Sequence, residues 1–229
     1  MNKNRSLDFL KVQAMAFAVL VLLSACAAQP KVAPSQQATI ITFAPDKSEP
    51  ISSETLSLAQ KMLQGRLDAV LAGNSEVQVV NNTLRVKLSD EKDLPIAVEL
   101  ATGRGEFNFV DSDKPISTGG FIPANPIVIM TDADIDIATA SNVSNMQTWI
   151  VDVTLTPEGQ RKLREYTKSH IENYVILTQD NKILSSTIIN TAYERGQLEI
   201  VGEFDKATAE VIATQLNSGR LPIQLVVTR

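Results

Sequence analysis

Cys26 is the residue whose side-chain type and position together predict a specific covalent chemistry. It is the only cysteine of the 229 residues, and it follows an apolar run, residues 12–23, that comes after a basic N-terminal segment. The run is roughly a dozen residues long, whereas a transmembrane helix needs roughly 20, so we expect a secretory signal rather than a membrane span. Cys26 then lies at the end of this run, where such a signal is cleaved.

The tetrapeptide Leu23-Ser24-Ala25-Cys26 resembles the lipobox of a bacterial lipoprotein signal peptide, whose cysteine carries diacylglycerol on sulfur and becomes the N-terminus after cleavage. This resemblance implies a signal peptide over residues 1–25 and lipidation at Cys26, with acyl chains such as palmitate. Each buried methylene contributes about 0.8 kcal/mol, so three acyl chains would anchor the protein to a membrane permanently. The alternative is an ordinary signal, or an uncleaved anchor, in which Cys26 has no special role. Without a second cysteine, no internal disulfide can form.

Composition restricts the classes of protein that are compatible with this chain. The formal net charge is −5, with 44% of the residues hydrophobic and 21% charged, which is ordinary for a globular protein. An acidic chain without a basic stripe does not suit nucleic acid, so we expect no nucleic-acid partner. The roughly two hundred residues after the signal suffice for one large domain or two lobes. They contain no further apolar stretch long enough to cross a membrane.

The segment after the signal predicts a tether and then a base lobe. Residues 26–37 are rich in Pro, Gln and Ala without apolar periodicity, so we expect a flexible tether that begins at the lipidated Cys26. Residues 38–112 alternate between strand and helix patterns, with strands expected at 39–43, 76–80, 83–88 and 106–110 and helices at 53–72 and 93–102. This β-α-β-β-α-β order predicts a ferredoxin-like base lobe.

The second half predicts a small α+β head lobe. Residues 113–126 contain several Pro and Gly residues and are expected to form a linker loop. In residues 127–229, Thr156 is expected to cap a helix that begins at Pro157, and Asp180-Asn181 to form a hairpin turn. The expected head-lobe elements are strands at 149–155, 174–178, 182–189 and 198–201, helices at 157–173 and between Asp205 and Gly219, and a terminal strand at 221–227. The predicted fold class is therefore α+β.

This pattern resembles the first periplasmic domain of SecD, the accessory subunit of the bacterial protein-secretion channel, in the SecD/SecDF protein-export family. The blocks that carry the resemblance are 153–159, 176–185, 188–190 and 207–227, with weaker similarity at 63–70, 105–110 and 131–140. The resemblance implies a ferredoxin-like base lobe with an α+β head. Asn181 stands where the family usually has Gly in an Asp-Gly turn, and Thr187 stands where Pro is common. Both departures are tolerable in a turn and a strand.

The family resemblance implies a non-enzymatic binding module on the extracytoplasmic (periplasmic) side of the cell envelope. Its partners would be unfolded exported polypeptides or components of the Sec translocase, and an exposed edge strand could accept an extended peptide by strand addition. Because the chain ends at Arg229, we expect it to lack the membrane helices that carry the family's proton-coupling acidic groups. The lipid on Cys26 would take the place of the entering helix. The alternative is a structural envelope lipoprotein that reuses the fold.

Residues suited to metal binding or catalysis are sparse. Asp132, Asp134 and Asp136 have the spacing that begins an EF-hand calcium loop. That loop needs Gly and Glu at positions 137 and 143, where this chain has Ile and Val, so we expect a solvated helix start instead. His170 is the only histidine, which excludes a zinc cluster built on histidines. We therefore expect no cofactor, no metal and no catalytic residues. A hydrolase is an alternative if the fold brings His170 together with two carboxylates.

Overall fold

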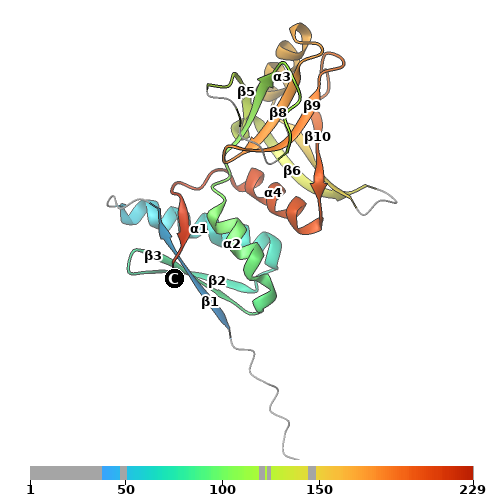
Figure 1. Cartoon of the computed structure of the whole chain (residues 1–229). Coiled ribbons are helices and arrows are strands. Elements are labelled where there is room, and N and C mark those ends of the chain that lie inside the picture. The colour runs from blue at the N-terminus through green and yellow to red at the C-terminus, as the bar shows by residue number, and fades with distance from the viewer. Residues whose placement is uncertain (1–37, 47–50, 119–121, 123–124, 144–147, 229) are drawn as a thin grey trace, which may run out of the picture. The chain divides into compact units, whose positions relative to one another are not determined.

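The structure is a computed structural model that describes residues 38–46, 51–118, 122, 125–143 and 148–228, and Figure 1 shows its elements. The expected signal peptide (1–25) and the tether with Cys26 (26–37) lie outside the described residues. Helices and three antiparallel sheets make up the described part, which confirms the predicted α+β class. None of the helices in that part combines the length and the apolar character needed to cross a bilayer.

One sheet and two helices form the base lobe. Its elements are β1 (Thr39–Pro45), α1 (Ser53–Leu71), β2 (Ser75–Val80), β3 (Thr83–Leu88), the 3-10 turn η1 (Glu91–Asp93), α2 (Leu94–Thr102) and β11 (Leu225–Val227). The strand order is β11-β1-β3-β2, and every neighbouring pair is antiparallel. In chain order these elements follow the β-α-β-β-α-β scheme of a ferredoxin-like fold.

Local sequence explains why the base elements form where they do. The Ser52 hydroxyl accepts a hydrogen bond from the Thr55 N–H at 3.1 Å, which caps the first turn of α1. Asn81 and Asn82 both have positive φ, which a two-residue turn between β2 and β3 requires. The buried face of α1, including Leu63 and Leu67, packs against the inner face of the sheet and gives this lobe its own core.

The remaining elements form the head lobe around two further sheets. They are β4 (Phe107–Ser112), β5 (Val128–Thr131), the 3-10 turn η2 (Asp132–Asp134), β6 (Ile135–Asn142), β7 (Trp149–Leu155), α3 (Pro157–Ser169), β8 (Tyr174–Gln179), β9 (Lys182–Ile188), β10 (Gln197–Phe204) and α4 (Lys206–Ser218). The sheets have the orders β5-β4-β8-β9 and β10-β7-β6. Their facing side chains share one core with α3 and α4.

Two strands belong to other sheets than the sequence pattern indicated. We expected residues 106–110 to close the base sheet within 38–112, and the terminal strand to belong to the head within 127–229. Instead β4 lies between β5 and β8 in the head, and β11 pairs with β1 in the base. The head is therefore inserted between α2 and β11. The physical reason is burial, because Phe107, Phe109 and Val110 bury both faces of β4, as a central strand requires.

A buried arginine joins the two chain connections that lead from the base to the head. Arg66 of α1 is fully buried, and each of its five N–H groups has an acceptor: the Ser218 hydroxyl and the carbonyls of Leu100, Gly103, Arg104 and Gly219, at 2.7–3.0 Å. Burial lowers the pKa of Arg66 to about 10, which still leaves it charged at neutral pH. The guanidinium therefore cross-links the segment after α2 to the end of α4.

Candidate functional site

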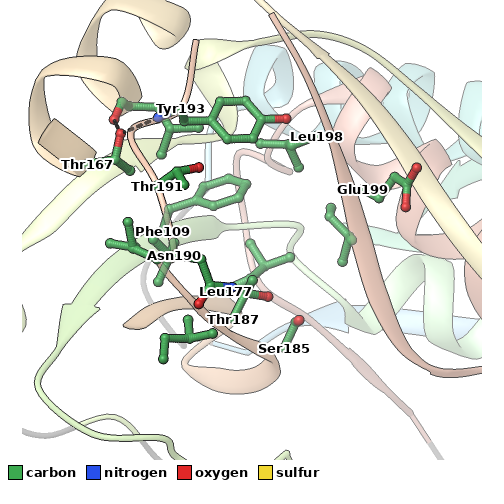
Figure 2. Close-up of a pocket in the computed structure, with 15 residues that line it drawn as sticks. Phe109, Thr167, Leu177, Ser185, Thr187, Asn190, Thr191, Tyr193, Leu198 and Glu199 are labelled. Atoms are coloured by element: carbon green, nitrogen blue, oxygen red, sulfur yellow. Dashed lines mark hydrogen bonds between the residues drawn. The ribbon is translucent and has the colours of Figure 1, made fainter. Parts of the chain in front are cut away.

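The candidate site is a cleft of about 290 Å³ in the head lobe, between the edge strands of its two sheets. Figure 2 shows the side chains that line it. The apolar part of the lining comes from Phe109, Leu163, Val175, Leu177, Leu198 and Ile200, and the polar part includes Ser185, Thr187, Asn190, Thr191 and Glu199. Strand β9 forms one side and β10 the other, so the cleft is bounded by the unpaired edges of two sheets.

The pairing register determines which main-chain groups of β10 lie at its open edge. The Leu155 N–H donates to the Gly196 carbonyl at 2.8 Å, and hydrogen-bonded pairs alternate along an antiparallel ladder. Leu198 and Ile200 therefore bond to β7, whereas the N–H and C=O groups of Gln197 and Glu199 point away from it. No hydrogen bond from the described part of the chain reaches these outward groups.

The same reasoning applies to β9 on the opposite side of the cleft. The Ile189 N–H donates to the Asn173 carbonyl at 2.8 Å, and the register continues from this pair into β8 and β9. The main-chain groups of Ser186 and Ile188 therefore point away from β8. Within the described residues, the two strands present donors and acceptors that have no partner beside an apolar floor, which is the arrangement that strand addition needs.

Two other sheet edges, those of β2 and β6, are capped by side-chain amides. On β2, the Val77 N–H donates to Gln64 Oε1 at 2.8 Å, and Gln60 Nε2 donates to the Val77 carbonyl at 2.8 Å. On β6, Asn217 of α4 accepts from the Ala138 N–H and donates to its carbonyl, both at 2.8 Å. These amides take the place of a neighbouring strand and block its approach.

The wall of the cleft after β9 is held against α3. The Tyr193 N–H donates to the Thr167 hydroxyl at 2.9 Å, and that hydroxyl donates to the Leu163 carbonyl at 2.8 Å. Gln160 Nε2 donates to the Glu194 carbonyl at 3.1 Å. Partial burial raises the pKa of Tyr193, so its phenol keeps its proton to a higher pH than an exposed tyrosine does. These contacts fix the loop that connects β9 to β10 and hold the cleft in shape.

The three aspartates considered for calcium have a structural arrangement instead. A capped 3-10 turn, η2, does begin at Asp132, and Asp136 is exposed, but Asp134 is buried, so the expected solvation is wrong for this residue. Its carboxylate accepts from the Thr131 N–H at 3.0 Å and from Lys162 Nζ at 2.8 and 3.0 Å. A Cβ at Gly159 would collide with the Asp134 carbonyl, which explains the glycine after Thr-Pro-Glu. Among the described residues, no cluster of His, Cys, Asp and Glu is placed to hold a metal ion.

His170 does not contribute to the cleft. It ends α3, where its ring stacks on Tyr166 with centroids 4.0 Å apart, and Nδ1 lies 2.8 Å from the Tyr166 carbonyl oxygen. The Tyr166 hydroxyl donates to Asp111, and desolvation together with this bond raises the pKa of Tyr166. Cys26, the predicted lipidation site, lies outside the described residues. The cleft residues were not identified from the sequence, although the alternation within 197–204 was an available signal.

The fold and the cleft define a class, a two-lobed α+β domain whose head lobe is inserted into a ferredoxin-like base. Comparison with known proteins identifies the family. Residues 109–223, just over half of the chain, match the model described as SecDF, P1 head subdomain, and the chain belongs to this family. Two subunits of protein translocases are similar over most of the chain: SecDF of Brucella abortus (26% identical, 73% of this chain) and SecD of Leptotrichia buccalis (25% identical, 76% of this chain).

Solved structures agree with this assignment at the level of fold. SecDF in its super-membrane-facing form matches 84% of this chain and 30% of its own with a TM-score of 0.70 at 24% identity. A structure of the membrane component SecDF that enhances protein export matches 83% of this chain and 98% of its own, with a TM-score of 0.66 and 24% identity. The chain spans 25% of the Brucella relative and 42% of the Leptotrichia relative.

Proposed function

We propose that this protein is a non-enzymatic binding module in protein export, which holds extended segments of exported polypeptides, or of translocase components, outside the cytoplasmic membrane. The observation that carries the proposal is the cleft between β9 and β10, where main-chain groups that have no partner in the described part of the chain border an apolar floor. Membership of the SecDF P1 head family supports it, since similar chains are subunits of protein translocases.

Strand addition explains how such a module would act without strict sequence preference. An extended segment would bond through its main chain to the outward groups of Gln197 and Glu199, while alternate side chains enter the apolar cleft. Main-chain bonds are the same for every sequence, and each contributes a modest net free energy of about 0.5–1.5 kcal/mol. The resulting affinity is low enough for release, which suits a module that handles many chains in transit.

Site-specific photocrosslinking in cells tests this function. A photoreactive amino acid would replace Thr187, whose side chain lines the cleft, and in a matched control it would replace Gln78, which is exposed on the closed edge β2. We expect crosslinks to exported polypeptides or translocase subunits from position 187 and none from position 78. Equal crosslinking from both positions, or none from the cleft, would overturn the proposal and favour a structural envelope lipoprotein.

We also propose that Cys26 carries the lipid that keeps this module at the membrane, facing the periplasm. The lipobox-like tetrapeptide before Cys26 supports this, and three acyl chains would bind essentially permanently. Mass measurement of the full-length protein purified from membranes should give an acylated chain that begins at Cys26. The Cys26→Ser variant should leave the membrane fraction or retain its signal. A mature chain that begins elsewhere and has no acyl group would rule out the anchor.

A further inference from the structure

The side chains of β10 alternate between the cleft and the opposite face of the sheet, and on that opposite face they form an acidic strip that includes Glu199. Ile200 is buried in the head core and Leu198 packs against that core, and both line the cleft. Glu199 lies between them in sequence and borders the cleft, but its side chain points to the opposite face of the sheet, away from the cleft floor, and is exposed (Figure 2). A strand added to β10 would alternate in the same way, with one side chain beside Glu199 and its two neighbours on the cleft side.

Glu199 lies in an electrostatically unfavourable position. Its Cα partner on the neighbouring strand β7 is Asp152, which is also exposed, and like charges directly opposite each other destabilise a sheet. Glu203 extends the same acidic row along β10. Within the described part of the chain, none of these carboxylates forms an ion pair, and the hydroxyl of Ser141, which donates to Asp152, is neutral and does not compensate the charge. A cation brought in by a partner would relieve this repulsion.

From this geometry we infer that the cleft selects extended segments in which a Lys or Arg is flanked on both sides by an apolar residue. The inference rests on the proposed function and specifies its substrate class. The basic side chain would lie beside Glu199, on the open edge of β10 away from Asp152, while the two apolar neighbours would occupy the cleft of about 290 Å³. That volume is at the low end of the range for ligand pockets, about 300–1,000 Å³, which suits a few side chains rather than a folded partner.

Binding of short fluorescent peptides to the full-length protein tests the inference. Three peptides share a Ser/Thr carrier and differ in a central triplet: Leu-Lys-Leu, Leu-Glu-Leu or Ser-Lys-Ser. We expect the Leu-Lys-Leu peptide to bind about tenfold more tightly than each of the others by fluorescence anisotropy. Its advantage over Leu-Glu-Leu should shrink at high salt because exposed charges are screened.

Two variants assign the selectivity to Glu199. Glu199→Gln should bring the Leu-Lys-Leu and Leu-Glu-Leu affinities within about threefold of each other, whereas Glu76→Gln, which removes an exposed carboxylate from β2, should leave the preference unchanged. Equal binding of all three peptides, or a preference that persists in Glu199→Gln, would overturn the inference and leave the proposed function standing. Failure of all three peptides to bind would instead count against the proposed function.

Discussion

The edge strands β2 and β10 belong to the same molecule but end their sheets differently. On β2, both main-chain groups of Val77 are occupied by glutamines of α1, so the middle of this edge behaves as though a further strand were present. On β10, the outward groups of Gln197 and Glu199 meet no partner within the described residues, and an apolar cleft lies beside them. An unprotected edge normally invites aggregation. A protein that closes some edges and leaves another open at a cleft has separated its structural sheet surfaces from a binding surface.

The largest effect should come from the joint that holds these two regions together. Replacing Arg66 by Met would remove a donor from four carbonyls and one hydroxyl, of which the Arg104 carbonyl keeps the Leu221 N–H, so we expect a loss of about 3 kcal/mol of unfolding free energy. Urea denaturation measures it, with Arg85→Met on the exposed face of β3 as control. Arg66→Lys keeps the positive charge but loses the planar guanidinium with its five donors, so its unfolding free energy should lie between those of Arg66→Met and the control. If Arg66→Met unfolds at the same urea concentration as the wild type, the hydrogen bonds of Arg66 do not stabilise the connection between the lobes.

Opening the edge of β6 should have the next largest effect. Asn217→Ala removes the acceptor of the buried Ala138 N–H and the donor to its carbonyl, and we expect a loss of about 2 kcal/mol. The matched control is Thr214→Ala on the same helix, where alanine also improves helix propensity. The variant should in addition form oligomers with time, because β6 becomes available for pairing. If the Asn217→Ala variant stays monomeric in size-exclusion chromatography, the amide is not needed to protect this edge.

Removing the glutamine that closes the edge of β2 tests the contrast between β2 and β10, and we expect a smaller loss of unfolding free energy than for Asn217→Ala. Gln64→Leu removes the acceptor of the Val77 N–H and the donor to the Ser75 carbonyl, which lies 3.2 Å from Gln64 Nε2. One of the two bonds is long, and Gln60 still donates to the Val77 carbonyl, so we expect a loss of about 1 kcal/mol. Lys61→Leu, an exposed position of the same helix, controls for the added apolar surface. If both variants unfold at the same urea concentration, the glutamine does not close the edge.

Local chemistry predicted most of the elements but not their partners. The caps at Thr156 and Asp205 are present, since their side chains accept from the N–H groups of Gly159 at 3.0 Å and Thr208 at 2.8 Å. The Asp180-Asn181 turn has positive φ at both residues, as expected. Sheet membership was not predictable, because β11 pairs with β1 across nearly the whole described chain. A strand pattern specifies a period and a buried face but not a neighbour.

The edge-closing residues were invisible in the sequence for the same reason. Asn217 bonds to a residue 79 positions away. It lies at an exposed position of its helix, where a polar side chain is ordinary and gives no signal in the sequence. Gln64 reaches a strand 13 positions away, beyond the helical spacings that sequence analysis uses. The family resemblance supplied the lobes, which the matching family model and structures confirm. The cleft depends on the geometry between two sheets, and no single segment encodes it.

The smallest predicted effect tests the open edge directly and rests on the proposed function. Gln197 is the first residue of β10, and its N–H points away from β7, so proline is tolerated there by the sheet. Gln197→Pro would remove one outward donor and place its ring in the path of an added strand, which should weaken binding of an extended peptide about fivefold, close to one net hydrogen bond. The matched control is Val79→Pro, whose N–H likewise points outward on β2. Anisotropy titrations in which both proline variants bind like the wild type would show that peptide does not add to β10, whereas equal weakening in both would show that binding does not distinguish the two edges.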